Sequence, residues 1–276
     1  MRAELRLRIP GEAPNSSEAS NPRDPLLAVQ NLSKIYTRGR QSITALDRVS
    51  FTLDRGHILG LVGGSGSGKS TLARCLAMFD APTSGDILFQ GSPLGPGCRL
   101  QIQLIVQQPA ASLNPRFTAA EIVEEPLLIQ RRGTAPERRD RAAAALALVG
   151  IGSAALGKRS HQFSGGERQR LAIARALVLE PKLLILDESF NGLDPSLTLQ
   201  ITALLGELRQ RLGLTYILIS HDLELVGSLA TEIGVMEGGR LVEHGPAGVL
   251  MHAPQHPRTW ELLAASLALG GGRGAA

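Results

Sequence analysis

A glycine-rich segment has the residue types and spacing that bind a nucleoside triphosphate: Gly63, Gly64, Ser65, Gly66, Ser67, Gly68, Lys69 and Ser70. Its glycines let the backbone turn tightly, so that successive N–H groups converge on phosphate oxygens. A helical pattern follows, which points a helix N-terminus at the same anion. We expect Lys69 to reach the β- and γ-phosphates, Ser70 to ligate Mg²⁺, and the adjoining Thr71 to belong to the same site. The lysine–serine pair makes a merely flexible glycine–serine loop the weaker interpretation.

Two adjacent carboxylates, Asp187 and Glu188, follow the apolar run 183–186. In a protein with a phosphate loop, an aspartate in this setting is expected to hold the Mg²⁺ shell. The neighbouring glutamate can orient and deprotonate an attacking water. The alternative is a strand that simply ends in a solvated loop.

The run Ser164-Gly165-Gly166-Glu167 has two compatible interpretations. In the first it is a capping box, with Ser164 as the N-cap of a helix and Glu167 three residues later. In the second it is another anion site, where two glycines clear space in front of a helix N-terminus. The local sequence alone does not choose between them.

Three single residues are weaker candidates. Gln107, at the end of an expected strand, could sense the metal or the water through its amide, although a polar loop residue is the simpler interpretation. His221 could hydrogen-bond a γ-phosphate or serve a structural role beside Asp222. Tyr36 could stack on a base, or be a half-buried strand residue.

Length and composition limit the remaining possibilities. A chain of 276 residues is long enough for one large α/β domain with a subdomain. The net charge of +4 suits a nucleotide or an anionic surface, but it does not indicate nucleic-acid binding, because the arginines are scattered without interleaved aromatic residues. The two cysteines, Cys75 and Cys98, exclude a disulfide framework and point to a reducing compartment.

No segment of the sequence predicts membrane insertion. The N-terminal residues lack the apolar stretch of a secretory signal. The long uncharged run Ala142–Gly157 is shorter than the roughly 18 apolar residues that a membrane helix needs.

The elements expected to position these residues alternate between strands and helices. Strands are predicted over 27–30, 49–53, 57–62, 85–89, 100–106, 183–186, 216–219, 233–236 and 240–243, the last two as a hairpin over Gly238–Gly239. Helices are predicted over 69–79, 167–180 and 197–212, and 119–158 is expected to be mainly helical with breaks at Pro126 and Pro136. A turn is predicted at Asn114–Pro115.

This order predicts an α/β fold: a P-loop NTPase (RecA-like) core with a small antiparallel β subdomain and an inserted helical subdomain. Residues 1–24 are expected to form a flexible tail, 25–255 the ATPase domain with its helical subdomain near 108–163, and 256–276 a C-terminal extension.

Taken together, the motifs closely resemble those of the nucleotide-binding subunit of an ABC transporter, over roughly 26–260. The order is specific: the phosphate loop, Gln107, the run from Phe163 to Glu167, Asp187-Glu188, Asp194 and His221. Within that family, Ala111–Arg116 and His256–Trp260 resemble the oligopeptide, dipeptide and nickel importer ATPases.

The resemblance implies a role for each matching residue. Tyr36 looks like the adenine-stacking aromatic, and Gln107 like the glutamine that links the Mg²⁺ site to the helical subdomain. Glu188 looks like the general base, and His221 like the switch residue for the γ-phosphate. The residues that would close on the partner subunit or its ATP are Ser164, Gly165, Gly166 and Asp194.

Three single positions and one run of four residues depart from the family pattern. Gly64 stands where an acidic residue is common, Gln108 where Asp, Asn or Glu is common, and Arg258 where an aromatic residue is usual. The run Ser189–Gly192 replaces the usual Pro-Thr-Ser-Ala. None of these changes removes a catalytic group, but the last one affects the loop expected at the dimer interface.

The implied function is ATP hydrolysis, with Mg²⁺, that energises a membrane importer for peptides or nickel. The implied partners are transmembrane permease subunits, a second ATPase subunit of the same or a paralogous kind and, indirectly, an extracytoplasmic solute-binding protein; no nucleic acid is expected. The implied location is the cytoplasmic face of the cell membrane. The alternatives are a soluble ABC-type ATPase that is not coupled to transport, an inactive regulatory partner, and a P-loop GTPase, for which no N-K-x-D run is present.

Overall fold

The computed structural model describes residues 25–106, 112–190, 192 and 194–270. These residues form two compact units. One unit, the nucleotide unit, is built from 25–104, 183–188 and 215–270. The other, the helical unit, is built from 105–182 and 189–214. The expected N-terminal tail, 1–24, lies outside the described residues.

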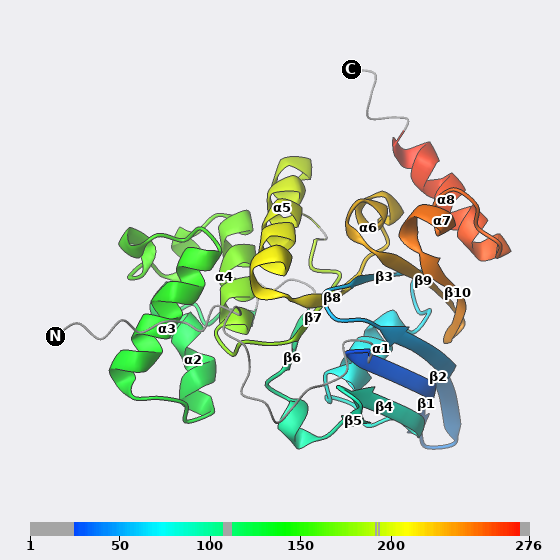
Figure 1. Ribbon diagram of the computed structural model, residues 1–276, viewed down its shortest axis with the longest axis horizontal. Helices are drawn as coiled ribbons and strands as arrows, with labels where there is room; N and C mark the ends of the chain where they lie inside the picture. The colour runs from blue at the N-terminus through cyan, green and yellow to red at the C-terminus, as the bar shows by residue number, and fades with distance from the viewer. Residues whose placement is uncertain (1–24, 107–111, 191, 193, 271–276) are drawn as a thin grey trace, which may run out of the picture. The chain divides into compact units, whose positions relative to one another are not determined.

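A six-stranded sheet runs through the nucleotide unit in the order β10-β9-β3-β8-β7-β6 (Figure 1). Its strands are β3 (Ile58–Val62), β6 (Ile102–Ile105), β7 (Leu183–Asp187), β8 (Thr215–Ile219), β9 (Glu232–Glu237) and β10 (Arg240–Pro246). The neighbours β9, β3, β8 and β7 are parallel, while β10 returns antiparallel as the second arm of the predicted hairpin. Every residue of β3, β7 and β8 is buried, as expected for apolar strands of a sheet that is covered on both faces.

A second sheet in this unit is antiparallel, with the order β2-β1-β4-β5. Its strands are β1 (Leu27–Arg38), β2 (Gln41–Leu53), β4 (Ser84–Phe89) and β5 (Ser92–Pro93). The predicted strands 27–30 and 49–53 were too short, because β1 and β2 continue as a long hairpin in which Tyr36 pairs with Ile43. The outer half of that hairpin is largely exposed and polar, so it carries no apolar alternation that could reveal it.

The core of the nucleotide unit lies where the two sheets face helix α1 (Lys69–Leu76). Leu59 and Leu61 of β3 join Leu72 and Leu76 of α1 in one buried cluster. Helix α1 is shorter than the predicted 69–79, because Met78 adopts a positive φ of 58° that ends the helix. Three helices of this unit were not predicted: α6 (Leu223–Leu229), α7 (Ala247–Leu250) and α8 (Pro257–Gly270).

The helical unit packs four α-helices, of which α2, α3 and α4 are the green group in Figure 1. They are α2 (Ala119–Ile129), α3 (Ala135–Leu148), α4 (Gly165–Leu177) and α5 (Pro195–Leu212). Capping boxes start α2, α3 and α4, so each helix begins where a threonine or serine precedes a glutamate by three residues. Short 3₁₀ helices complete the described chain at Pro96–Cys98, Ser153–Ala155 and Ser160–Gln162.

The predicted helix break at Pro126 was wrong. Helix α2 continues through Pro126 to Ile129. A proline removes one backbone hydrogen bond, but the buried face of Ile122, Val123 and Leu127 holds the helix in place by packing. Pro136 lies in the first turn of α3, where the missing N–H has no helical partner to lose.

The two cysteines differ in their surroundings. Cys75, in α1, is fully buried, and this burial raises the pKa of its thiol to about 11, whereas Cys98 is only partly buried. Because a thiolate is the reactive species and a raised pKa keeps the thiol protonated, we expect Cys98 to react with a maleimide at pH 7.5 at least about tenfold faster than Cys75. Mass spectrometry of the native chain and of a Cys98→Ser variant would measure the two rates; equal labelling would contradict the burial of Cys75.

None of the helices in the described parts of the chain has both the length and the apolar character to cross a membrane.

Candidate functional site

The phosphate loop, the acidic pair and His221 all follow the carboxyl ends of three neighbouring parallel strands. Strand β8 lies between β3 and β7, with Ile219 opposite both Leu61 and Asp187. The chain therefore leaves β3 as the phosphate loop, β7 at Asp187 and β8 just before His221, at one edge of the sheet. Open α/β sheets bind ligands at this edge.

The phosphate loop is held from outside by the β9–β10 hairpin. Gly63 and Gly68 adopt φ values of 148° and 105°, which side chains rarely tolerate. At Gly63 a Cβ atom would also lie 2.2 Å from the carbonyl oxygen of Met236, so only glycine fits there. The N–H of Gly239, in the hairpin turn, donates to the carbonyl of Ser67 at 3.0 Å. The sequence predicted the hairpin, but it carried no signal that the hairpin supports this loop.

Lys69 lies inside the loop, with 5% of its surface exposed. Its ammonium group donates to the carbonyls of Gly63 and Gly64 at 2.8 and 2.9 Å and to the hydroxyl of Ser67 at 3.2 Å. Burial lowers the pKa of Lys69, and the carboxylates of Glu188 and Asp187 oppose that shift. The geometry places a donor-rich cation at the centre of the glycine-rich turn.

Asp187 and Ser70 are brought into contact from β7 and α1. The hydroxyl of Ser70 donates to Oδ1 of Asp187 at 3.1 Å. Burial raises the pKa of Asp187; the Ser70 bond lowers it, the charge of Glu188 raises it and that of Lys69 lowers it. Two residues that the sequence assigned to Mg²⁺ are thus adjacent.

This donor set suits Mg²⁺, which takes oxygen ligands and commonly binds through one or two carboxylates together with substrate phosphates. Across the described ranges, no group of three or more His, Cys, Asp and Glu side chains is placed to hold a metal by itself. The third expected contributor, Gln107, lies outside the described residues.

Glu188 has an unusual backbone. Its φ is 48°, in the left-handed region, and its N–H donates to the carbonyl of Ile219 at 3.0 Å. Left-handed conformations are uncommon for residues with a side chain and occur often at functional sites. The side chain is half-buried beside the Asp187 carboxylate, whose pKa its charge raises.

Tyr36 and His221 lie on exposed parts of the nucleotide unit. The hydroxyl of Tyr36 donates to Oδ2 of Asp80 at 2.7 Å, and the ammonium of Lys34 lies 4.9 Å from the centre of its ring. Burial and the Asp80 carboxylate raise the pKa of Tyr36. His221 lies two residues after the end of β8, and its neighbour Asp222 caps α6 by accepting from the N–H of Leu225 at 3.0 Å. Base stacking by Tyr36 and phosphate contact by His221 stay predictions.

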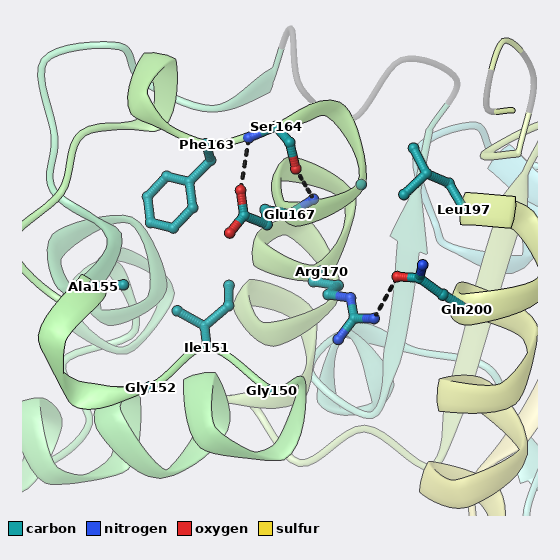
Figure 2. A pocket seen from close by; sticks show the side chains of 11 residues that line it. Gly150, Ile151, Gly152, Ala155, Phe163, Ser164, Glu167, Arg170, Leu197 and Gln200 are labelled. Carbon is teal, nitrogen blue, oxygen red and sulfur yellow. Dashed lines mark hydrogen bonds between the residues drawn. The ribbon is translucent and has the colours of Figure 1, made fainter.

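Ser164 and Glu167 form the capping box that the sequence suggested. The N–H of Ser164 donates to Oε2 of Glu167 at 2.8 Å, and the N–H of Glu167 donates to Oγ of Ser164 at 3.3 Å. The backbone bond from Ser164 lowers the pKa of Glu167. Both residues line a pocket of about 280 Å³ in the helical unit, and its lining also includes the hydrogen-bonded pair Arg170 and Gln200 (Figure 2). The capping reading is therefore correct, and the anion reading stays compatible with it.

Two further segments discussed in the sequence analysis lie in the helical unit. Asp194 caps α5 by accepting from the N–H of Leu197 at 2.9 Å and from the hydroxyl of Ser196 at 2.7 Å. Ser189 and Phe190 belong to the run after Glu188 that differs from the family pattern, and both are buried. The hydroxyl of Ser189 donates to the carbonyl of Ile105 at 3.1 Å. These two unusual residues are thus built into the unit's interior.

The two glycines at the start of α4 differ in the space around them. A Cβ at Gly166 would lie 2.6 Å from Cδ2 of Leu197, whereas a Cβ at Gly165 would meet nothing within 4 Å. We expect Gly166→Ala to lower the unfolding temperature by a few degrees, because overpacking costs about 1–3 kcal/mol. Gly165→Ala is the matched control and should not lower it, since alanine has the higher helix propensity. Thermal unfolding followed by circular dichroism measures both; equal midpoints would contradict the contact with Leu197.

The chain is similar in sequence to a known protein family and to several curated proteins. Residues 46–191 match the family model described as "ABC transporter". The chain is 42% identical over 264 residues to the dipeptide transport ATP-binding protein DppF of Escherichia coli (strain K12), a match that covers 91% of this chain and 79% of the relative. It is 41% identical over 251 residues to the oligopeptide transport ATP-binding protein OppF of Bacillus subtilis (strain 168), covering 88% and 82%.

Solved structures show the same fold. The ATP-binding cassette MJ0796, in a dimeric post-hydrolysis state bound to ADP and Pi, matches with a TM-score of 0.71 and 30% identity, over 80% of this chain and 98% of that one. The cbiO1 protein of Clostridium perfringens, part of the ABC transporter complex cbiONQ, matches with a TM-score of 0.75 and 30% identity, over 89% and 95%. These matches confirm the predicted P-loop NTPase fold.

Proposed function

The chain belongs to the ABC transporter family of ATP-binding proteins, and from this membership we propose that it hydrolyses ATP to energise the import of peptides across a membrane. Relatives above 40% identity are named for dipeptide and oligopeptide transport, which favours peptides over nickel, the other solute that the sequence left open. One observation carries the chemical part of the proposal: Lys69, Ser70, Asp187 and Glu188 gather at one edge of the parallel sheet.

The proposed binding step uses the phosphate loop. The β- and γ-phosphates would accept hydrogen bonds from the ammonium of Lys69, which in the structure donates to the carbonyls of Gly63 and Gly64. Backbone N–H groups from 63–71 and the N-terminus of α1 would donate to the same oxygens. Tyr36 is the proposed partner of the adenine ring.

Ser70, Asp187 and, by resemblance, Gln107 are the residues that would hold Mg²⁺. When bound, the ion supplies positive charge that offsets the charge developing on the phosphate oxygens. The Ser70–Asp187 contact supports this assignment, because both side chains would turn oxygen atoms toward one point.

Glu188 is the proposed general base. Its carboxylate would accept a proton from the water whose oxygen forms the new bond to the γ-phosphorus, while the bond from that phosphorus to the β–γ bridging oxygen breaks. His221 would hydrogen-bond the γ-phosphate. The products are ADP and inorganic phosphate, so atoms and charge balance without another reactant.

A second ATPase subunit would complete each site. We propose that Ser164, Gly165 and Gly166 close on ATP held by that partner, and that Asp194 lies at the interface between the two. The N-terminus of α4, where Gly165 and Gly166 carry no side chain, supports the first assignment. The closed dimer binds ATP more tightly than the open one, and this difference drives the conformational change.

The transport partners are permease subunits, reached from the cytoplasmic face of the membrane, and a solute-binding protein that delivers peptide from outside. Co-expression with a permease encoded beside this chain tests this assignment. The expected result is a co-purifying complex in proteoliposomes whose ATPase rate rises several-fold with binding protein and peptide, and not with nickel. An active ATPase that never associates with a permease would instead indicate a soluble ABC-type ATPase.

A further inference from the structure

The guanidinium group of Arg258, on the C-terminal helix α8, lies against the phosphate loop. A Cβ atom built on Gly64 would lie 2.9 Å from Nη2 of Arg258. Among the described residues, no other atom outside the immediate chain neighbours comes within 4 Å of that position. The arginine thus occupies the space that any side chain at residue 64 would need, and two residues almost two hundred positions apart fit each other.

Hydrogen bonds to Glu243 fix the first residues of α8 and the residues just before it, and so fix the backbone position of Arg258. The carboxylate of Glu243, on β10, accepts from the N–H groups of Gln255 and His256 at 2.8 and 3.1 Å, and from the hydroxyl of the fully buried Thr259. Burial alone would raise the pKa of Glu243, but the bonds from Thr259, Gln255 and His256 outweigh it and lower the pKa. Arg258 is therefore held from the residues on both sides of it.

Two carboxylates orient the guanidinium. Nη1 of Arg258 donates to Oε2 of Glu261 at 2.7 Å, and Nε lies 3.7 Å from Oε1 of Glu237. Glu237 is the last residue of β9, directly before the hairpin turn whose Gly239 supports Ser67. With two acids beside it, the arginine is better suited to bracing the loop than to attracting phosphate as a free charge.

Gly64 connects Arg258 to the ammonium group of Lys69. The carbonyl oxygen of Gly64, the residue that Arg258 covers, accepts from the ammonium of Lys69 at 2.9 Å. A loop fixed in its binding conformation before the ligand arrives loses less entropy on binding. Anything that lets the Gly64 peptide move is therefore expected to weaken nucleotide binding through Lys69.

We propose that Arg258 is a positioning residue for the phosphate loop, which makes α8 part of the nucleotide site although it carries no group that touches the nucleotide. The proposal rests on the proposed function, since it assumes that the loop binds ATP. It also explains why a glycine at 64 and an arginine at 258 occur together in this chain.

A double-mutant cycle on residues 64 and 258 tests the brace. Arg258→Ala removes the guanidinium, and Gly64→Ala pushes it aside at little steric cost, because the clashing atom is the end of a flexible side chain. Each single variant is expected to weaken binding of a non-hydrolysable ATP analogue by roughly 3-fold to 10-fold, measured by calorimetry with Mg²⁺. The double variant should bind no more weakly than Arg258→Ala, since Gly64→Ala then has nothing to displace.

Controls distinguish a loss of the Arg258 contact from a loss of folding and from a failure of the proposed function. Arg55→Ala, at an exposed turn of the same unit, should bind the analogue as the native chain does. Thermal unfolding without nucleotide identifies folded variants, and Gly64→Ala tests the brace if Arg258→Ala does not fold. Native affinity in Arg258→Ala, or independent effects of the two changes, would overturn the brace. A native chain that binds no nucleotide would instead overturn the proposed function.

Discussion

Replacing Glu188 by glutamine is expected to slow ATP hydrolysis by roughly 10²-fold to 10⁴-fold while ATP binding is retained. Glutamine has nearly the size and shape of glutamate, so the left-handed backbone at φ 48° and the N–H bond to Ile219 are kept. The amide cannot accept a proton from the attacking water, and the neutral side chain no longer adds its charge to that of Asp187. The loss should therefore fall on the chemical step.

Single-turnover phosphate release from the assembled transporter measures that step, and analogue binding measures the affinity. Glu224→Gln is a matched control, because Glu224 is an exposed acid in the first turn of α6 within the same unit. Near-native turnover of Glu188→Gln would remove Glu188 from the role of general base. A parallel loss of binding would show that the carboxylate supports the loop instead.

Replacing Lys69 by alanine is expected to weaken ATP binding by roughly 10-fold to 100-fold. Hydrogen bonds to charged groups contribute about 1.5–3 kcal/mol each, and each 1.4 kcal/mol is a tenfold change in affinity. The variant loses the ammonium that the triphosphate would receive, and it leaves the carbonyls of Gly63 and Gly64 without that donor. Both effects act on the loop and not on the adenine side of the site.

Calorimetry with ATP and ADP measures this loss, and Lys158→Ala, at an exposed position of the helical unit, controls for removal of one positive charge. The ratio of ATP to ADP affinity should also fall, because Lys69 is expected to contact the γ-phosphate. Unchanged affinity in Lys69→Ala would overturn the phosphate-loop assignment.

The candidate catalytic residues could be located from the sequence because each of their motifs is a short, continuous run of residues. A glycine-rich turn ending in Lys69-Ser70 and an apolar strand ending in Asp187-Glu188 need no distant residue to be recognised. In the structure these motifs come together because the strands that carry them are parallel neighbours in one sheet, and Ser70 contacts Asp187.

The elements that support the site were harder to predict, because their signals are tertiary. The long β1–β2 hairpin has a polar, exposed outer half, and α2 keeps Pro126 within a packed helix. The pairing of Gly64 with Arg258 depends on a fold that joins distant parts of the chain. Periodicity reports which face of an element is buried, but not which partner buries it.

Because Lys69 donates hydrogen bonds to oxygens of its own loop, a bound nucleotide must replace these acceptors with its phosphate oxygens. In the structure the ammonium donates to three oxygen atoms, two carbonyls and one hydroxyl, all of them uncharged. An incoming ligand gains only the difference between its own oxygens and these, so a multiply charged triphosphate is favoured and a neutral nucleoside gains nothing from the cation. The loop thereby favours ligands with a high negative charge, whatever the shape of the rest of the ligand.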